Sequence, residues 1–348
     1  MARADRVTVR GGGVFGLACA YELARRGAKV RLIERERIGA GSSGGTVGML
    51  SPHVPDQWNP KKQFQFDSLV MSEAFWAGVK EVGGKDAGFA RIGRLQPLAD
   101  QAAVTLAELR AKDAAANWGA DYLWRIAPVN EFGAFAPVTP TGLVIHDTLS
   151  GRASPRGAAA ALAAAIEALG GEIVFGDAPD EGIVLHATGL AGLVELSAAF
   201  GKEVGNGVKG QSAILKLDPG PVPQIFADGV LVVPHANGTV GVGSTAERSY
   251  TDPTATDDQL DAVLERARAL VPALADAEVI ERWANVRPRS VSRSPMLGAW
   301  PGREGHFIVN GGFKIGFGMA PKVAQVMADL VLEGVDAIPA GFRVEDNL

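Results

Sequence analysis

The sequence predicts an α/β fold in two domains, one built on parallel strands and one on a mostly antiparallel sheet. At the start of the chain, residues 6–10, 14–26 and 29–34 have the patterns of a strand, a helix and a second strand, with Gly27 ending the helix. From about 208 to 250, short Val-rich segments are separated by Gly, Pro and Asn, which is typical of antiparallel strands. The length of 348 residues suits two domains.

The remaining elements follow from apolar spacing and end signals. Residues 155–170 are expected to form a helix that begins at Pro155 and ends at Gly170, and residues 182–189 a buried strand that runs into a glycine turn. The last helix is expected to begin at Pro321, because proline is favoured in the first helical turn. Further helices are expected at 64–82, 101–116, 257–270 and 321–333, with a strand and turn at 88–98 and a last strand at 303–310.

Composition excludes several classes of function. Thirty-four basic and 39 acidic residues give a net charge of −5, which does not favour a nucleic-acid partner because neutralising phosphates needs a basic face. The single Cys19 leaves no intramolecular disulfide and no thiolate cluster, so a cytoplasmic location is expected. Four early glycines interrupt the first apolar stretch, and no secretory leader or membrane span is predicted. The five histidines show no metal-ligand spacing, so no metal is expected.

The first strand–helix junction carries a dinucleotide-binding pattern. Gly11, Gly13 and Gly16 form G-x-G-x-x-G, and Glu34 ends the second strand. Glycines here allow a tight turn, a close approach to a diphosphate and close helix packing, while the acid can accept hydrogen bonds from a ribose and disfavours NADP. A second match at Gly205, Gly207 and Gly210 is rejected because the residues after it read as a strand. A Rossmann-like domain with one nucleotide site therefore favours a tightly held flavin.

The order of motifs resembles the D-amino acid oxidase superfamily of flavoproteins, and most closely its glycine oxidase and sarcosine oxidase-like branch. The resemblance covers nearly the whole chain. It implies non-covalent FAD, since no cysteine lies near residues 311–318, called the late loop below. It rests on GGGVFGLACAYELARRG at 11–27, SSGGTVGMLSPH at 42–53, IVLHATG at 183–189, VKGQ at 208–211, WANVRP at 283–288 and NGGFKIGFGMAP at 310–321.

The resemblance implies how the chain is divided and which residues contact FAD. The FAD-binding domain would comprise residues 1–75, 150–200 and 305–348, and the substrate-binding domain residues 76–149 and 201–304. Implied contacts at the ADP end, beside the three motif glycines, are Val14, Phe15, Glu34, Arg35 and Val174. Contacts nearer the diphosphate and the ring would come from Ser42, Ser43, Thr46, Val47, Gly48, Met49, Gly189, Gly312, Phe313, Lys314, Ile315, Gly316, Phe317 and Gly318.

The same resemblance indicates a site for an amino acid or amine substrate. Arg287 occupies the arginine position of the WANVRP segment, and an arginine fork matches a carboxylate. Lys314 stands where the closest branch has an arginine, so it keeps the charge but changes the geometry. Leu231 replaces a tyrosine that helps to hold substrate, and His53 or His235 could substitute for it. The expected reaction transfers a hydride to flavin N5 and yields an imine, then an oxo acid and an amine.

Several alternatives remain open at this point. Arg289 and Arg293 read as a solvated basic loop, or as a site for a second anionic group of an acidic or N-substituted amino acid. Arg10 replaces a usual aliphatic residue and receives no role. A 2-hydroxy acid dehydrogenase would need His53 or His235 as a base. A flavin-binding subunit without its own activity is the other alternative. The electron acceptor would be O₂ or another molecule, and a homo-oligomer is not excluded.

Overall fold

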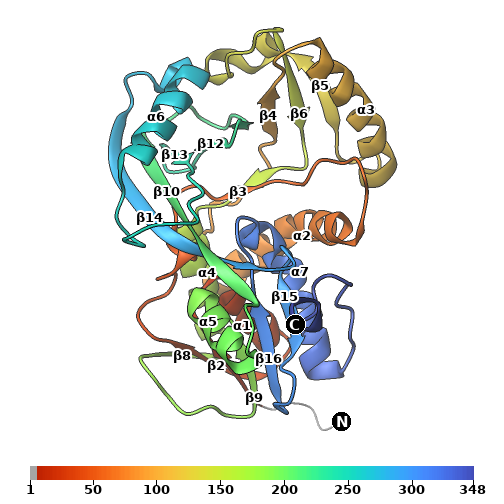
Figure 1. Ribbon diagram of the computed structural model, residues 1–348, viewed down its shortest axis with the longest axis vertical. Helices are drawn as coiled ribbons and strands as arrows, with labels where there is room; N and C mark the ends of the chain where they lie inside the picture. Colours follow the sequence, from red (N-terminus) through yellow and green to blue (C-terminus); the bar gives the residue numbers. More distant parts are fainter. Residues whose placement is uncertain (1–5) are drawn as a thin grey trace.

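A computed structural model describes residues 6–348 and confirms the α/β class with two main sheets (Figure 1). The smaller sheet has six strands, all paired in parallel except β15 with β16. Its order is β15 (Met296–Ala299), β16 (His306–Asn310), β9 (Ile183–His186), β1 (Arg6–Arg10), β2 (Lys29–Glu34) and β8 (Glu172–Phe175). Residues 1–5, on which the expectation about a secretory leader partly rests, lie outside the described residues.

The larger sheet has eight strands and is antiparallel except where β11 pairs with β4. This confirms the mostly antiparallel sheet predicted from the 208–250 region. Its order is β14 (Glu278–Ser290), β10 (Gly205–Lys216), β13 (Thr239–Gly243), β12 (Val230–Pro234), β11 (Gln224–Ala227), β4 (Arg94–Pro97), β6 (Leu143–Asp147) and β5 (Trp124–Pro128). A two-stranded ribbon pairs β3 (Met49–Leu50) with β7 (Gly151–Arg152).

Seven α-helices among the described residues complete the fold. Their bounds are α1 (Val14–Arg25), α2 (Pro60–Gly83), α3 (Gln101–Trp118), α4 (Pro155–Ala168), α5 (Gly189–Phe200), α6 (Asp258–Leu270) and α7 (Gly316–Ala328). Helix α5 was not predicted, because Gly189 was interpreted as a turn. Within residues 6–348, no helix combines the length and apolar content needed to cross a bilayer.

The start of α7 corrects the prediction that the last helix begins at Pro321. The helix begins at Gly316 and contains Pro321, because the buried Met319 and Ala320 extend its apolar face towards the N-terminus. Met319 N–H already donates to the Ile315 carbonyl at 3.0 Å, which closes the first turn. The residues 316–318, predicted as loop, therefore present the free N–H groups of a helix end.

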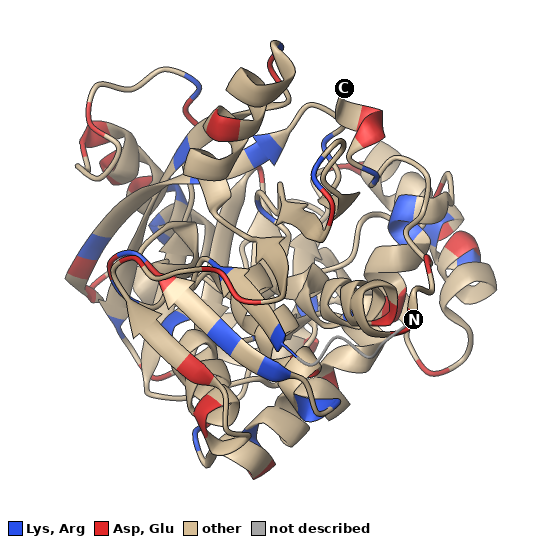
Figure 2. Cartoon of the chain, turned by 90° about the horizontal axis from the view of Figure 1, so that it is seen from below, with Lys and Arg blue, Asp and Glu red and all other residues tan. Residues whose placement is uncertain are grey.

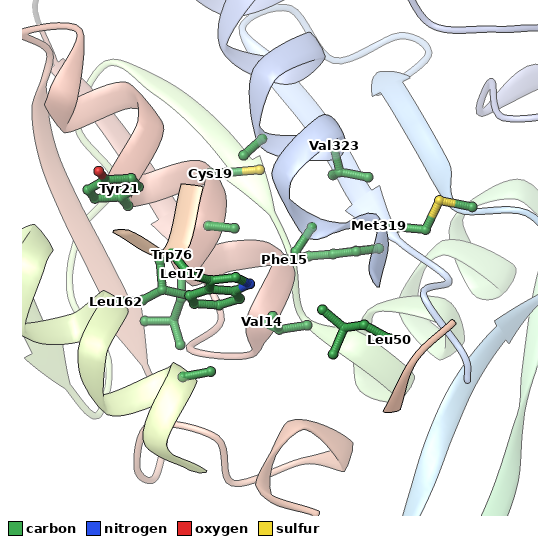
Figure 3. Close-up of a cluster of buried hydrophobic side chains, with 14 of the residues drawn as sticks. Val14, Phe15, Leu17, Cys19, Tyr21, Leu50, Trp76, Leu162, Met319 and Val323 are labelled. Carbon is green, nitrogen blue, oxygen red and sulfur yellow. The ribbon is translucent and has the colours of Figure 1, made fainter. Parts of the chain in front are cut away.

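Helix α1 fills the centre of the larger hydrophobic core and packs against α7 and α4. Phe15 and Cys19 project from α1 towards α7, where Met319 and Val323 lie (Figure 3). Cys19 is buried, and burial raises the pKa of its thiol, which keeps the thiol in its unreactive protonated form. Burial of an apolar side chain such as Phe15, Met319 or Val323 contributes about 1.5–3 kcal/mol, so this packing stabilises the position of α1 against α7.

The structure gives Arg10 a role that the sequence did not. At the end of β1, its guanidinium contacts Asp180 at 2.6 Å and Asp177 at 3.2 Å, and it donates to the carbonyl of Ala178 at 3.0 Å. Arg10 thus ties the loop between β8 and β9 to the strand that leads into the glycine turn. Elsewhere, basic and acidic segments are interspersed when the molecule is seen from below (Figure 2).

Strands β10 and β14 extend side by side from the larger sheet towards the smaller one (Figure 1). The rejected glycine match, 205–210, lies entirely inside β10, so no helix N-terminus is present there. Arg287 pairs with Val208, and Trp283 with Ser212. Because side chains alternate along a strand, these four residues share one face of the sheet with Gly210 and Asn285. That face is called the cleft face below.

Candidate active site

Of the three motif glycines in the turn, two have no space for a side chain and one does. A Cβ on Gly11, whose φ is +108°, would lie 2.3 Å from the Ala187 carbonyl oxygen, and one on Gly16 would lie 2.0 Å from the Gly11 oxygen. A Cβ on Gly13 would meet only Ser43 Oγ, at 3.4 Å. Gly13 is the N-cap of α1 and provides no side-chain cap. The turn therefore leaves room and helix N–H groups for a diphosphate, as FAD requires.

The polar groups beside this turn suit the other parts of a dinucleotide. Val14 N–H donates to Ser43 Oγ at 2.9 Å. Each oxygen of the Glu34 carboxylate accepts one backbone N–H, from Gly12 at 2.6 Å and from Glu36 at 2.9 Å. A carboxylate oxygen can accept a further bond, so Glu34 is both positioned by the backbone and able to bind a ribose hydroxyl.

The loop 39–50 lies between the glycine turn and the cleft face. Thr46 Oγ1 lies 2.7 Å from Ser212 Oγ, and the Thr46 carbonyl is 3.0 Å from His235 Nε2. Asn285 Nδ2 donates to the carbonyl of Ala40 at 3.1 Å. A Cβ on Gly241 would lie 2.3 Å from the Thr46 carbonyl oxygen, so the strand there has no space for a side chain. The predicted cofactor residues 42–49 are thus held against the larger sheet.

The late loop approaches the same turn from the opposite side. A Cβ on Gly312 would lie 2.9 Å from the Phe15 ring, and one on Gly316 would lie 3.4 Å from Val14 Cγ1. The structure therefore brings together the predicted cofactor residues of the segments 11–16, 42–49 and 312–318. The predicted ADP-end residues lie along neighbouring strands: Val174 of β8 pairs with Ile33 of β2, next to Glu34. Gly189 begins α5, and Arg35 is exposed, 3.4 Å from Glu36.

Arg287 is partly buried on the cleft face and has no carboxylate within ion-pair distance among residues 6–348. Its Nη1 donates to the Thr245 carbonyl at 3.1 Å, and its guanidinium lies against the backbone of Gly210. Burial lowers the pKa of Arg287 to about 10, an effect that the charge of Glu247 opposes. The guanidinium is therefore charged at neutral pH, and an anionic ligand would stabilise it.

Lys314 and Phe313 lie beside Arg287, at the start of the late loop. Phe313 adopts a positive φ of 44°, and its N–H donates to the Pro288 carbonyl at 3.0 Å, which fixes the loop to β14. Lys314 is exposed, with its Nζ 5.8 Å from the centre of the Phe313 ring. Desolvation by nearby atoms, and then the positive charge of Arg287, lower the pKa of Lys314. The positive charges of Arg287 and Lys314 are therefore close enough to interact with each other.

Both predicted histidines hold loops in place. His53 Nδ1 makes a short contact with Gln65 Oε1, and burial lowers the pKa of His53. His235 Nε2 bonds the Thr46 carbonyl, and burial lowers the pKa of His235 as well. Leu231 lies on the cleft face, opposite Gly243, so a hydroxyl is missing where the family places tyrosine.

Sequence reasoning missed Gly210 and Thr245, which position Arg287. Gly210 was considered only as part of a rejected nucleotide motif. Its position directly before a predicted strand was the available signal, since a glycine within a strand often marks a close approach of another group. Thr245 contributes only its carbonyl oxygen, which no residue pattern reveals.

Comparison with known proteins agrees with this geometry. The family model described as "DAO: FAD dependent oxidoreductase" matches residues 6–330. Glycine oxidase of Pseudomonas aeruginosa is 28% identical, with 94% of each chain covered. The crystal structure of glycine oxidase from Geobacillus kaustophilus superposes with a TM-score of 0.83 at 23% identity, covering 98% of both chains. Iminodiacetate oxidase from Chelativorans sp. BNC1 gives 0.83 at 22% identity, covering 97% of this chain and 98% of that one. The chain belongs to the DAO family of FAD-dependent oxidoreductases, and its cofactor is FAD.

Proposed function

We propose that this protein oxidises the carbon–nitrogen bond of an amino acid: a D-amino acid, glycine or an N-alkyl glycine. The observation that carries the proposal is Arg287, a partly buried guanidinium without a carboxylate partner, placed on the cleft face beside the late loop. A guanidinium in this setting matches the carboxylate that every amino acid carries. The names of the relatives, which include several glycine oxidases, support the same substrate class.

The residues divide the work between substrate and cofactor. Arg287 binds the substrate carboxylate with a fork held by Thr245 and Gly210, and Lys314 adds a second positive charge. Residues 11–16, 42–49 and 312–318 hold FAD, and the free N–H groups at the start of α7 favour negative charge nearby. Bound FAD supplies the acceptor for the hydride leaving the substrate carbon. The imine product is hydrolysed to an oxo acid and an amine, and the electrons pass on to O₂ or another acceptor.

Oxidation of a 2-hydroxy acid is the alternative reaction, and it differs in its need for a base. Removing a hydroxyl proton needs a general base within reach of the substrate. His53 Nδ1 bonds Gln65 and His235 Nε2 bonds the Thr46 carbonyl, which orients each ring and leaves its other nitrogen as the candidate base, so the substrate panel below decides between the two reactions. An amine substrate in its neutral form needs no such base. A flavin-binding subunit without activity has no use for a charged guanidinium kept partly buried and unpaired, which favours the enzyme.

Anaerobic reduction of the FAD-loaded protein tests the proposal. Glycine, sarcosine and both enantiomers of alanine, aspartate and asparagine are mixed with the protein beside matching 2-hydroxy acids, and bleaching of the flavin band is followed. At least one amine is expected to bleach it. Arg287→Met should lower the rate at low substrate concentration roughly 100-fold, the loss expected for two charge-assisted hydrogen bonds.

Arg282→Met is the matched control. Arg282 lies on the same strand but on the opposite face, where it pairs with Asp261 at 2.7 Å. This variant should bleach as the parent does. Bleaching by hydroxy acids alone, or by no compound of the panel, would overturn the proposed function.

A further inference from the structure

Two positively charged side chains, Arg289 and Lys314, flank the ring of Phe313, and Arg287 lies on the same sheet face as Arg289. Arg287 and Arg289 are two residues apart on β14, so both project from the cleft face. The Arg289 guanidinium lies 5.8 Å from the centre of the Phe313 ring, and Lys314 Nζ lies 5.8 Å from the same point. The positive φ of Phe313, 44°, keeps its ring at this position although that backbone conformation is uncommon outside glycine. Arg289 is therefore part of a sheet, rather than of the solvated loop that the sequence suggested.

None of the three cations forms an ion pair within residues 6–348. Arg289 donates to the neutral Asn206 Oδ1 at 3.1 Å, and Arg287 to a backbone carbonyl. Lys314 Nζ lies 5.8 Å from the centre of the Phe313 ring, and none of the carboxylates in the described part of the chain pairs with it. The chain does provide a counter-charge elsewhere on this sheet, where buried Arg94 contacts Asp147 at 2.8 Å. The cluster thus concentrates three like charges without a protein anion.

The carboxylate whose charge reaches this cluster is already committed to other groups. Glu247 accepts from Gln211 at 3.0 Å, makes a short contact with Thr245 Oγ1, and lies 3.5 Å from Lys209 Nζ. Lys209 and Gln211 alternate with Gly210 along β10, so they project from the sheet face opposite to Arg287. The negative charge of Glu247 therefore balances the positive charge of Lys209 and only partly balances that of Arg287.

We propose that the substrate carries a second anionic group, as an acidic amino acid or an N-(carboxyalkyl) amino acid does. This inference rests on the proposed function. One carboxylate has two acceptor oxygens and fills the fork of Arg287. A second carboxylate, a few bonds away, fits between Arg289 and Lys314, where it relieves the repulsion of the remaining two charges. A neutral amino acid leaves those two cations without a partner.

Matched substrate pairs test the inference on the FAD-loaded protein. Aspartate against asparagine and glutamate against glutamine, each as both enantiomers, and iminodiacetate against sarcosine are compared by kcat/KM. The dianionic member is expected to be favoured at least about tenfold, with a preference that shrinks at high salt. Arg289→Gln should reduce that ratio at least about tenfold, and Arg282→Gln, on the opposite face, should not change it. Equal efficiency on both members of each pair would overturn the inference while the proposed function stands.

A binding experiment distinguishes failure of this inference from failure of the proposed function. Succinate and propionate, which lack an amine, are titrated against the perturbation of the flavin spectrum. Tighter binding of succinate, lost in Arg289→Gln and in Lys314→Gln, supports a site for two anionic groups even if no amine reduces the flavin. Equal binding of both acids, or binding of succinate that neither substitution weakens, would overturn it. Should Arg289→Gln lose FAD, Lys314→Gln alone decides the outcome.

Discussion

The guanidinium of Arg287 occupies the space where a side chain at position 210 would be. A Cβ built on Gly210 would lie 1.8 Å from Arg287 Nη2, 2.0 Å from Cζ and 2.1 Å from Nη1. All three distances are far shorter than a van der Waals contact, so the arginine can adopt this position only over a glycine. Gly210 is thereby a positioning residue for the proposed carboxylate site.

Gly210→Ala is expected to displace Arg287 and to raise KM for the substrate roughly 10- to 100-fold, with a smaller change in kcat, because carboxylate binding depends on this fork. Gly207→Ala is the control. It lies on the same strand, and its Cβ would approach Val286 and Tyr250 instead. It should lower stability without this KM effect. Equal KM values for the two variants would contradict the positioning role.

The glycine turn predicts that FAD binding and folding can be separated. Gly13→Ala meets only Ser43 Oγ at 3.4 Å, so the chain without FAD should keep its stability, while the methyl group obstructs the diphosphate. Gly16→Ala would place its Cβ 2.0 Å from the Gly11 oxygen and should cost about 1–3 kcal/mol in the free energy of unfolding. Urea unfolding without FAD, and FAD titration by fluorescence, measure the two effects. Full FAD affinity in Gly13→Ala would refute the placement of the diphosphate.

Buried His186, which contacts the partly exposed His306, predicts a loss of stability in acid. His186 Nε2 lies 2.9 Å from His306 Nδ1. Burial, and then the charges of His306 and Arg303, lower the pKa of His186 from 6.5 to about 4. Between these pH values the unfolded chain binds a proton that the folded chain does not, so the free energy of unfolding falls as pH decreases from 6.5 towards 4.

His186→Gln removes that proton linkage. Between pH 7 and pH 4.5, the variant should therefore lose about 2 kcal/mol less in the free energy of unfolding than the parent. Well above pH 6.5, at pH 8 for example, His186 is deprotonated in both the folded and the unfolded chain, so the pH dependence of the two proteins should run parallel there. Urea unfolding at several pH values measures the difference, and identical slopes in acid would show that His186 does not titrate as stated.

Arg10→Met should loosen the loop that precedes β9. The substitution removes the contacts to Asp180 and Asp177 while keeping an apolar stem of similar length. The expected cost is about 1 kcal/mol, with faster hydrogen exchange of the amides at 177–181. Arg6→Met is the comparison, because Arg6 pairs with Glu181 of the same loop from a more exposed position. A larger effect at Arg6 than at Arg10 would contradict the interpretation.

The sequence was sufficient for the parts of the fold that depend on local pattern. The first strand–helix–strand unit was predicted because Gly11, Gly13 and Gly16 stand between a Val-rich strand and an apolar helix. Helix α5 was missed although Leu193 and Leu196, both buried, follow helical spacing, because Gly189 was read as the end of the element. The start of α7 was misplaced because burial of Met319 outweighs the preference of proline for a first turn.

Non-local register explains what was missed in the candidate site. Arg287 was identified from its own segment. The fit of its guanidinium over Gly210 depends on the pairing of β10 with β14, between residues far apart in the chain. Arg289 was read, together with Arg293, as part of a solvated basic loop. The strand continues to Ser290, and alternation then places Arg289 beside Arg287.

The bonds of Ala40 and Thr46 to the larger sheet bear on how FAD enters and leaves. The loop 39–50, on one side of the proposed FAD site, is hydrogen-bonded to β10, β14 and the segment after β12, so we expect it to move together with the larger sheet. We therefore expect release of the flavin to require the two sheets to move apart. Exchange of bound FAD with free FAD should therefore be as slow as the separation of the two sheets. A chain that has bound FAD should retain it through many turnovers.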